Sequence, residues 1–267
     1  KQLSEYGGLA TVFIGRKPAI SINTIQLAKE ALVQDVFSGR PALPIFDWIS
    51  HGLGIIMVTF NHSWRQQRRF ALHTLRNFGL GKKTVEDRVL EESQYLIAEM
   101  LKDEGKPVDP HHPIQNAVSN IICSIVFGDR FEYNNKRFEY LLKMLNETIM
   151  LAGSASGRQK FNKDSTFHEG NLLASAGDLF MAGTDTTETT IRWGLLFLIQ
   201  NPDVQERCHE EIVQVLGYDR LPSMDDRDRL PYTLATVHEI QRYGNIIPIL
   251  IHETILPTKL QGYSIPQ

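Results

Sequence analysis

The feature that most constrains this fold is a long helical segment. Apolar residues recur at helical spacing over residues 166–199, which predicts the longest helix of the chain. A possible capping box, Thr166 with Glu169, marks its start. Helical periodicity also dominates elsewhere, so we expect a mainly α protein with a small β region. In the middle of the long helix a run of small and polar residues interrupts the apolar stretch: Ala182-Gly183-Thr184-Asp185-Thr186-Thr187.

This small and polar run has two interpretations. Ala182 and Thr186 lie four residues apart and share a helix face with Gly183, so a hydroxyl would stand beside a position without a Cβ. A flat ligand could approach the helix closely there. Alternatively, the run is a bent packing seam, because a mid-helix threonine can return its hydroxyl to the carbonyl one turn back and glycine weakens a helix by about 1 kcal/mol. Taken alone, the helix favours the packing seam.

We expect a single domain over residues 1–267. Strand signals are confined to the two ends, beginning with a hairpin in which residues 11–14 and 19–22 flank a Gly-Pro turn. Glycine, proline and capping residues divide the helices between them. The parts in chain order are a β-rich start (1–62), helices (63–152), a short polar loop (153–165), the long helix with further helices (166–244), and short strands (245–267).

Composition excludes some classes of function. The 28 basic and 31 acidic residues nearly balance, so the net charge of -3 gives no reason to expect a nucleic-acid partner. The two cysteines, Cys123 and Cys208, are far apart and form no CxxC motif, which favours a reducing environment without a disulfide. The apolar runs are shorter than the roughly 20 residues that cross a bilayer, so we expect no membrane anchor within this sequence.

A second predicted helix contains two hydrogen-bond donors on one face. Trp64 and Arg68 lie one turn apart, and their indole N–H and guanidinium are donors suited to a carboxylate or a phosphate. The alternative is a solvated basic helix that the tryptophan anchors to the core, since Arg65, Arg69 and Arg76 lie on the same segment.

Each motif alone is a weak signal, but their order along the chain is informative. Glu239 and Arg242, at i and i+3, can pair across one helical turn, which by itself is a weak signal. Together the segments resemble cytochrome P450, and their residues are most similar to those of its vertebrate microsomal family 2. The resemblance covers nearly the whole chain. The segments are Phe37-Ser38-Gly39-Arg40, Trp64-x-x-x-Arg68-Arg69-Phe70, Thr74-Leu75-Arg76-Asn77-Phe78-Gly79, Ala182-Gly183-Thr184-Asp185-Thr186-Thr187, and Pro231-Tyr232 leading to Glu239-x-x-Arg242-Tyr243.

The resemblance implies the cytochrome P450 fold and a bound haem. Asp185 and Thr186 match the acid and the alcohol that guide protons to dioxygen in that family. Gly183 matches the glycine that leaves room for the oxygen, with Ala182 beside it facing the haem. These roles displace the packing-seam interpretation, and they make Asp185 and Thr186 the expected catalytic residues.

The same resemblance supplies the expected haem-binding and structural residues. Arg40, Trp64 and Arg68 match donors to the haem propionates, which are carboxylates and suit charge-assisted hydrogen bonds. His252 matches a further propionate donor, although the chain is one residue shorter than the family between Pro248 and His252, which leaves the register of His252 open. The remaining two residues match a buried structural pair, Glu239 with Arg242.

The activity that the resemblance implies is a monooxygenase reaction on a lipophilic substrate, such as a fatty acid, a steroid or a xenobiotic. Electrons would come from NADPH through cytochrome P450 reductase, with cytochrome b5 as a second candidate donor. The full-length protein would associate with the endoplasmic reticulum membrane on its cytosolic face. Substrate contacts would come from Phe180, Ile247, Ile249 and Leu250.

Two departures from the family pattern are evident. The family's iron ligand is a cysteine in a loop of the form Phe-x-x-Gly-x-Arg-x-Cys-x-Gly, and the 267 residues contain no such loop. Neither Cys123 nor Cys208 matches the ligand position, so no metal ligand is expected here. Several helices that roof the family's pocket are replaced by the short loop at 153–165. We therefore expect the parent protein to be the enzyme and this polypeptide to be inactive as written. The alternatives are a non-catalytic truncated product that acts by binding, or an unrelated all-helical interaction domain.

Overall fold

The computed structural model describes residues 5–41, 52–56, 58–77, 83–103, 105–143 and 169–266. These residues form a mainly helical structure with two small antiparallel β-hairpins, as expected. The elements in chain order are β1 (Leu9–Ile14), β2 (Lys17–Ile22), α1 (Ile25–Leu32), η2 (Asp35–Phe37), α3 (His62–Asn77), α4 (Lys83–Leu101), α5 (His111–Val126), α7 (Glu169–Gln200), α8 (Pro202–Leu216), η3 (Met224–Arg229), α9 (Pro231–Gly244), β3 (Thr258–Leu260) and β4 (Tyr263–Ile265).

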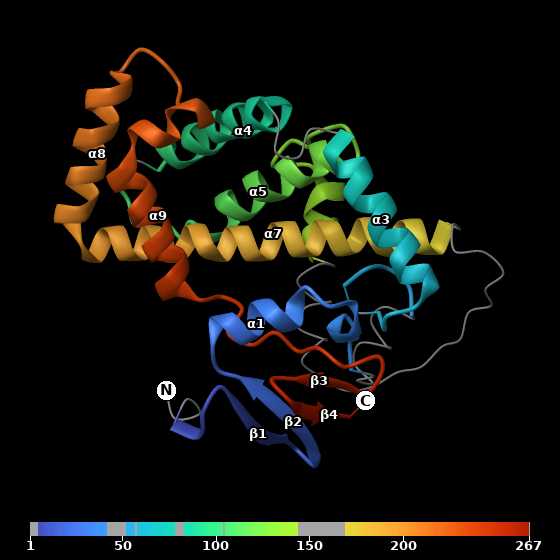
Figure 1. Cartoon of the computed structure of the whole chain (residues 1–267). Coiled ribbons are helices and arrows are strands. Elements are labelled where there is room, and N and C mark those ends of the chain that lie inside the picture. The colour runs from blue at the N-terminus through green and yellow to red at the C-terminus, as the bar shows by residue number, and fades with distance from the viewer. Residues whose placement is uncertain are drawn as a thin grey trace.

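The long helix α7 crosses the middle of the molecule and organises the other elements (Figure 1). Helices α4 and α5 lie on one side of it, and α1 with both hairpins lies on the other (Figure 1). Helix α5 packs directly against α7, while α8 and α9 contact its C-terminal part. A Cβ added to Gly183 of α7 would lie 2.5 Å from Cδ1 of Ile122 on α5. The absence of a side chain at Gly183 thus lets the two helices approach closely.

Replacing Gly183 by valine is expected to lower the free energy of unfolding by about 1–3 kcal/mol, because the added atoms would displace Ile122 from a packed interface. Gly177 is the matched control: it lies on the same helix, and an added Cβ there would meet none of the described atoms within 4 Å. Gly177→Val is expected to change stability by less than about 0.5 kcal/mol, since valine and glycine differ little in helix propensity. Urea denaturation measures both variants, and equal losses would contradict the packing role of Gly183.

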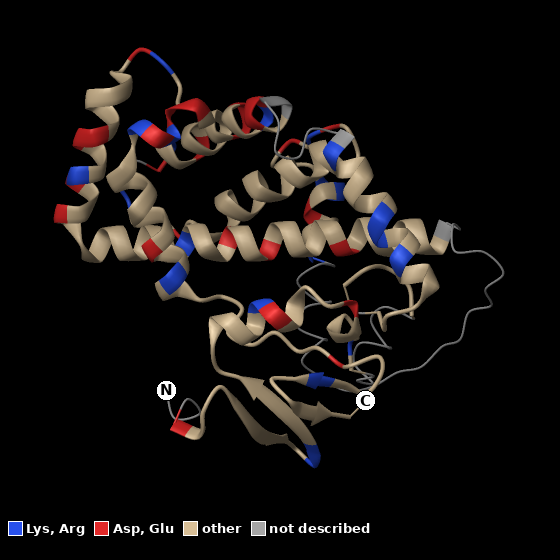
Figure 2. Cartoon of the chain, in the orientation of Figure 1, with Lys and Arg blue, Asp and Glu red and all other residues tan. Residues whose placement is uncertain are grey.

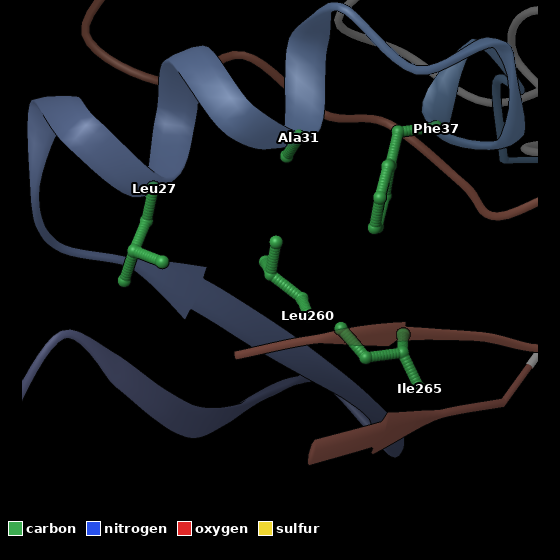
Figure 3. Close-up of a cluster of buried hydrophobic side chains, with 5 residues drawn as sticks. All are labelled: Leu27, Ala31, Phe37, Leu260 and Ile265. Atoms are coloured by element: carbon green, nitrogen blue, oxygen red, sulfur yellow. The ribbon is translucent and has the colours of Figure 1, made fainter. Parts of the chain in front are cut away.

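The two ends of the chain meet in a second packed region. Buried apolar side chains of α1 and η2 contact buried side chains of the C-terminal hairpin (Figure 3). The N-terminal hairpin contributes partly buried residues, with Leu9 paired to Ile22 in its register. This core joins segments that are more than 200 residues apart in sequence, so it holds the C-terminal segment beside the start of the chain. Its buried members are Leu27, Ala31, Phe37, Leu260 and Ile265.

Local sequence signals located most elements. Asn61 precedes α3, and its side-chain oxygen accepts a hydrogen bond from the backbone N–H of Trp64 at 2.8 Å. Asn201 precedes α8 but makes no side-chain cap, and its amide donates to the Phe197 carbonyl instead. The expected loop at 153–165 and Thr166 of the expected capping box lie outside the described residues.

Candidate functional site

A backbone crossing between residues 36–40 and residues 252–255 builds the first part of the site. Glu253 donates its N–H to the Gly39 carbonyl at 2.9 Å, and Ile255 donates to the Val36 carbonyl at 2.9 Å. A side chain at residue 39 would overlap the Glu253 carbonyl oxygen, so the crossing requires glycine at Gly39. The crossing places the next residue, Arg40, beside His252.

Arg40 and His252 are half-buried and share a hydrogen-bond network. Nη1 of Arg40 lies 2.9 Å from Nδ1 and 3.4 Å from Nε2 of His252, and Nδ1 lies 2.6 Å from the Phe37 carbonyl oxygen. If Nδ1 carries the proton and donates to Phe37, Nε2 is the nitrogen that can accept from Arg40. Burial lowers the pKa of His252, opposed by the Phe37 carbonyl and reinforced by the charge of Arg40. Burial and the charge of Arg68 lower the pKa of Arg40.

Arg40 and His252 open onto a cavity whose other wall is helix α3. The cavity has a volume of about 1060 Å³, near the upper end of the range for small-molecule sites. Figure 2 shows basic residues recurring along α3. Among the described residues that line the cavity, five are arginines and one, Asp35, carries a carboxylate, so its charge favours an anionic ligand. The five are Arg40, Arg65, Arg68, Arg69 and Arg76.

Trp64 lines this cavity, but its indole N–H is already engaged. The indole donates to the Ile55 carbonyl at 2.9 Å, and its ring packs against Phe60 at a centroid distance of 5.1 Å. The guanidinium of Arg68 lies 5.4 Å from the centre of the Trp64 ring, a cation–π contact. In this structure Trp64 therefore positions Arg68 and the residue 52–56 loop. Its expected role as a direct propionate donor stays a prediction.

Two α7 residues that the sequence did not single out fix the loop that contacts Trp64. Asp178 accepts hydrogen bonds from the backbone N–H groups of Ile55 and Ile56 at 2.6 and 3.0 Å, and Asn171 accepts from the Gly54 N–H at 3.0 Å. Burial raises the pKa of Asp178, and the two backbone donors oppose that shift. The signal that could have identified Asp178 is a lone carboxylate within the apolar part of a helix, one turn before Ala182.

The small and polar run lies in the middle of α7, and its residues divide between two roles. Thr186 donates its hydroxyl to the Ala182 carbonyl at 2.7 Å, so it returns a hydrogen bond within the helix. Thr184 is fully buried and accepts from Ser119 of α5 at 3.3 Å. Together with Gly183 these contacts realise the packing-seam interpretation. Burial raises the pKa of Asp185, opposed by the charge of His111.

The structure does not unite the two halves of the expected site in one cavity. The cavity between Arg40 and α3 is lined by none of the described α7 residues. The expected catalytic pair, Asp185 with Thr186, therefore lies apart from the cationic wall. Their oxygen-activating roles stay predictions.

The expected substrate contacts lie elsewhere than in a shared pocket. Phe180 is buried in a core cluster with Cys123, Phe138 and Leu142, because its face of α7 packs on α5. Contact of Phe180 with substrate stays a prediction. The other three residues are exposed, since they lie in an irregular segment after α9: Ile247, Ile249 and Leu250.

The expected structural pair forms, but not in a buried setting. Nε and Nη2 of Arg242 donate to the two Glu239 carboxylate oxygens at 2.7 and 2.6 Å, a bidentate ion pair. Both side chains are exposed, 67% for Arg242 and 60% for Glu239, because they project from the outer face of α9. The hydrogen bonds from Arg242 lower the pKa of Glu239. The pair forms as expected, but the expectation that its two side chains are buried is wrong.

The two free cysteines lie in different surroundings. Cys123 is fully buried, and burial raises the pKa of its thiol to about 12, so it stays protonated at neutral pH. Cys208 on α8 lies 3.4 Å from the Thr236 hydroxyl. The described residues contain no group of three or more histidine, cysteine or acidic side chains that could hold a metal ion. Among the described helices, none combines the length and apolar character needed to span a membrane.

Comparison with known proteins identifies the family. The family model for cytochrome P450 matches residues 2–161 and 149–267. Cytochrome P450 2J2 of Homo sapiens is 38% identical over 327 aligned positions, which cover 99% of this chain and 65% of the human protein. Cytochrome P450 2H2 of Gallus gallus is 36% identical, with 100% and 67% of the two chains covered.

The matches also show where this chain differs in length from its relatives. The chain spans about two thirds of the length of these relatives. Since the 327 aligned positions exceed the 267 residues of the chain, at least 60 positions of the human protein have no counterpart here. The two segments matched by the family model overlap at residues 149–161. A family model that matches along the sequence, with more than a third of positions identical to these relatives, establishes that the chain belongs to the cytochrome P450 family.

Proposed function

We propose that this chain supplies the propionate-binding wall and the central helix of a haem-dependent monooxygenase. The observation that carries the proposal is the convergence of Arg40, Arg68 and His252 on one cationic cavity, although they come from three distant segments. Burial and then the charge of Arg68 lower the pKa of Arg40, and a bound carboxylate would relieve both effects. A cavity of about 1060 Å³ with this donor set fits a flat ligand that carries two carboxylates.

The residues of the chain divide the proposed work between them. Arg40 and Arg68 would hold the propionates, with His252 fixing the side chain of Arg40. Bound haem would supply the redox-active iron at which dioxygen reacts. Asp185 would supply a carboxyl group for proton transfer, with its pKa raised by burial, and Thr186 would pass a proton through its hydroxyl. Asp178 and Asn171 would hold the residue 52–56 loop against α7.

The finer parts of the function are proposals by family resemblance. The substrate would be a lipophilic organic molecule, such as a fatty acid, a steroid or a xenobiotic. NADPH-cytochrome P450 reductase would supply electrons, with cytochrome b5 as a second donor, and an acidic donor protein would complement Arg65, Arg69 and Arg76 of α3. Membrane association at the cytosolic face of the endoplasmic reticulum is proposed for the full-length protein.

Titrating haem into the 267-residue chain tests the proposal. We expect saturable binding of one haem, and a reduced, carbon-monoxide-bound form without the red-shifted Soret band of thiolate ligation, because Cys123 is buried and protonated. Failure to bind haem would contradict the proposed function. A red-shifted Soret band would show that one of the two cysteines reaches the iron, and it would exclude the second candidate function, a non-catalytic chain that acts by binding.

A further inference from the structure

None of the described α7 residues lines the cationic cavity, yet the Asp178 carboxylate of α7 is linked to it through the residue 52–56 loop. A single oxygen of Asp178, Oδ2, accepts the backbone N–H groups of both Ile55 and Ile56, at 2.6 and 3.0 Å. Gly54 permits this approach, because a Cβ at that residue would overlap the same oxygen. Asp178 therefore fixes the orientation of the loop backbone at Ile55.

Ile55 continues this connection toward helix α3. Its N–H donates to Asp178, while its carbonyl accepts the indole N–H of Trp64 at 2.9 Å. The backbone donor of one residue thus bonds α7, and its backbone acceptor bonds α3. Because both groups belong to one short stretch of backbone, a loop that leaves Asp178 would also move the acceptor of the indole.

The Trp64 ring is in turn the contact that holds Arg68. The Arg68 guanidinium lies 5.4 Å from the centre of that ring, and the residue is exposed. Within the described part of the chain, no carboxylate pairs with Arg68, and its charge acts against that of Arg40. A long side chain without an ion-pair partner has many accessible rotamers, so the position of Arg68 depends on the Trp64 ring.

We propose that Asp178 is a positioning residue for haem binding, which holds the Arg68 guanidinium in place through Ile55 and Trp64. The inference rests on the proposed function, because Arg68 is one of the two arginines assigned to the propionates. It extends that function to a residue outside the cavity. Once the loop is released, the ligand itself would have to order Arg68, and ordering one long side chain weakens binding by about two- to tenfold.

The first measurement needs no haem and follows the Trp64 indole in the full 267-residue chain labelled with ¹⁵N. The resonance of this indole is the one that disappears in Trp64→Phe. We expect Asp178→Leu to accelerate exchange of the indole proton with water, because leucine has the branched shape of aspartate but no acceptor for the loop. Asp178→Asn should retain slow exchange, since its amide oxygen can accept from the same N–H groups. Thr184→Val is the matched control: it removes a buried hydroxyl from the α5 side of the same helix and should leave the exchange rate unchanged.

The second measurement determines whether the effect reaches the ligand through Arg68. The preference for haem over its dimethyl ester is compared in a double-variant cycle, because only haem carries the carboxylates that Arg68 would bind. Asp178→Leu should lower this preference about two- to tenfold, and Asp178→Asn should restore it. In an Arg68→Leu background Asp178→Leu should lower the preference no further, whereas in an Arg40→Leu background its effect should persist. Gly54→Ala obstructs the same contact from the loop, so it should reproduce both losses, and it provides the test if Asp178→Leu does not fold.

Two results would overturn the proposal. One is an unchanged rate of indole exchange in Asp178→Leu, which would show that Trp64 does not depend on Asp178. The other is an equal effect of Asp178→Leu on the haem preference with and without Arg68, which would show a general loss of structure rather than positioning. A wild-type chain that binds no haem would contradict the proposed function and with it the haem-binding role of Asp178, whereas the indole measurement alone reports whether Asp178 positions Trp64.

Discussion

Replacing Glu92 by alanine is expected to lower the free energy of unfolding by about 3–5 kcal/mol, because it would leave a buried charge network without its acceptor. Glu92 lies on α4 and is 3% exposed. Its carboxylate accepts from Nε of Arg130 at 3.0 Å, from the Tyr133 hydroxyl at 2.8 Å and from the Asn120 amide at 3.3 Å. Burial and the hydrogen bond to Glu92 raise the pKa of Tyr133, so its hydroxyl remains a donor.

This network fastens three separate elements together. Asn120 of α5 also bonds the backbone of Phe131 in both directions, with its amide donating at 2.7 Å and its carbonyl accepting at 2.9 Å. Removing Glu92 would therefore loosen α4, α5 and the segment that follows α5. In the cavity left behind, Arg130 and Tyr133 would have to find water or remain unpaired, which is the source of the large loss.

Glu132 provides the matched control for Glu92. It pairs with the same arginine, since Nη1 of Arg130 lies 3.3 Å from its carboxylate, but its side chain is 76% exposed. Glu132→Ala is expected to cost less than about 1 kcal/mol, because exposed ion pairs contribute little. Urea unfolding of the two variants gives the comparison. Similar losses for both would show that burial of the Glu92 network does not stabilise this fold.

The sequence predicted the elements well because the signals for helices are local. Proline at the first position of α8 and α9, and the spacing of apolar residues along α7, act over one or two turns. The resemblance to cytochrome P450 implied that Arg40, Arg68 and His252 share a site, and the three residues line one cavity. The network of Glu92 was missed because its partners lie 28 to 41 residues away.

The parts of the candidate site that differ from expectation depend on tertiary packing. Phe180 and Gly183 carry the apolar and small-residue signals of a ligand site, yet both face α5, because a helix face that can approach a ligand can equally approach another helix. The lone carboxylate of Asp178 did not reveal its role, since that role arises from contacts between α7 and the residue 52–56 loop. A helical period specifies which residues share a face, not which neighbour that face meets.

The most direct test of the central claim, that the cavity beside Arg40 binds the carboxylates of haem, compares haem with its dimethyl ester. The ester has the same ring but no anionic groups. Wild-type chain is expected to bind haem about tenfold or more tightly than the ester, since a hydrogen bond to a charged group contributes about 1.5–3 kcal/mol. The double variant Arg40→Leu/Arg68→Leu should lose most of this preference while binding the ester as wild type does. Arg16→Leu, in the turn of the N-terminal hairpin and outside the cavity lining, should retain the preference. A haem-over-ester preference that survives in the double variant would contradict the assignment.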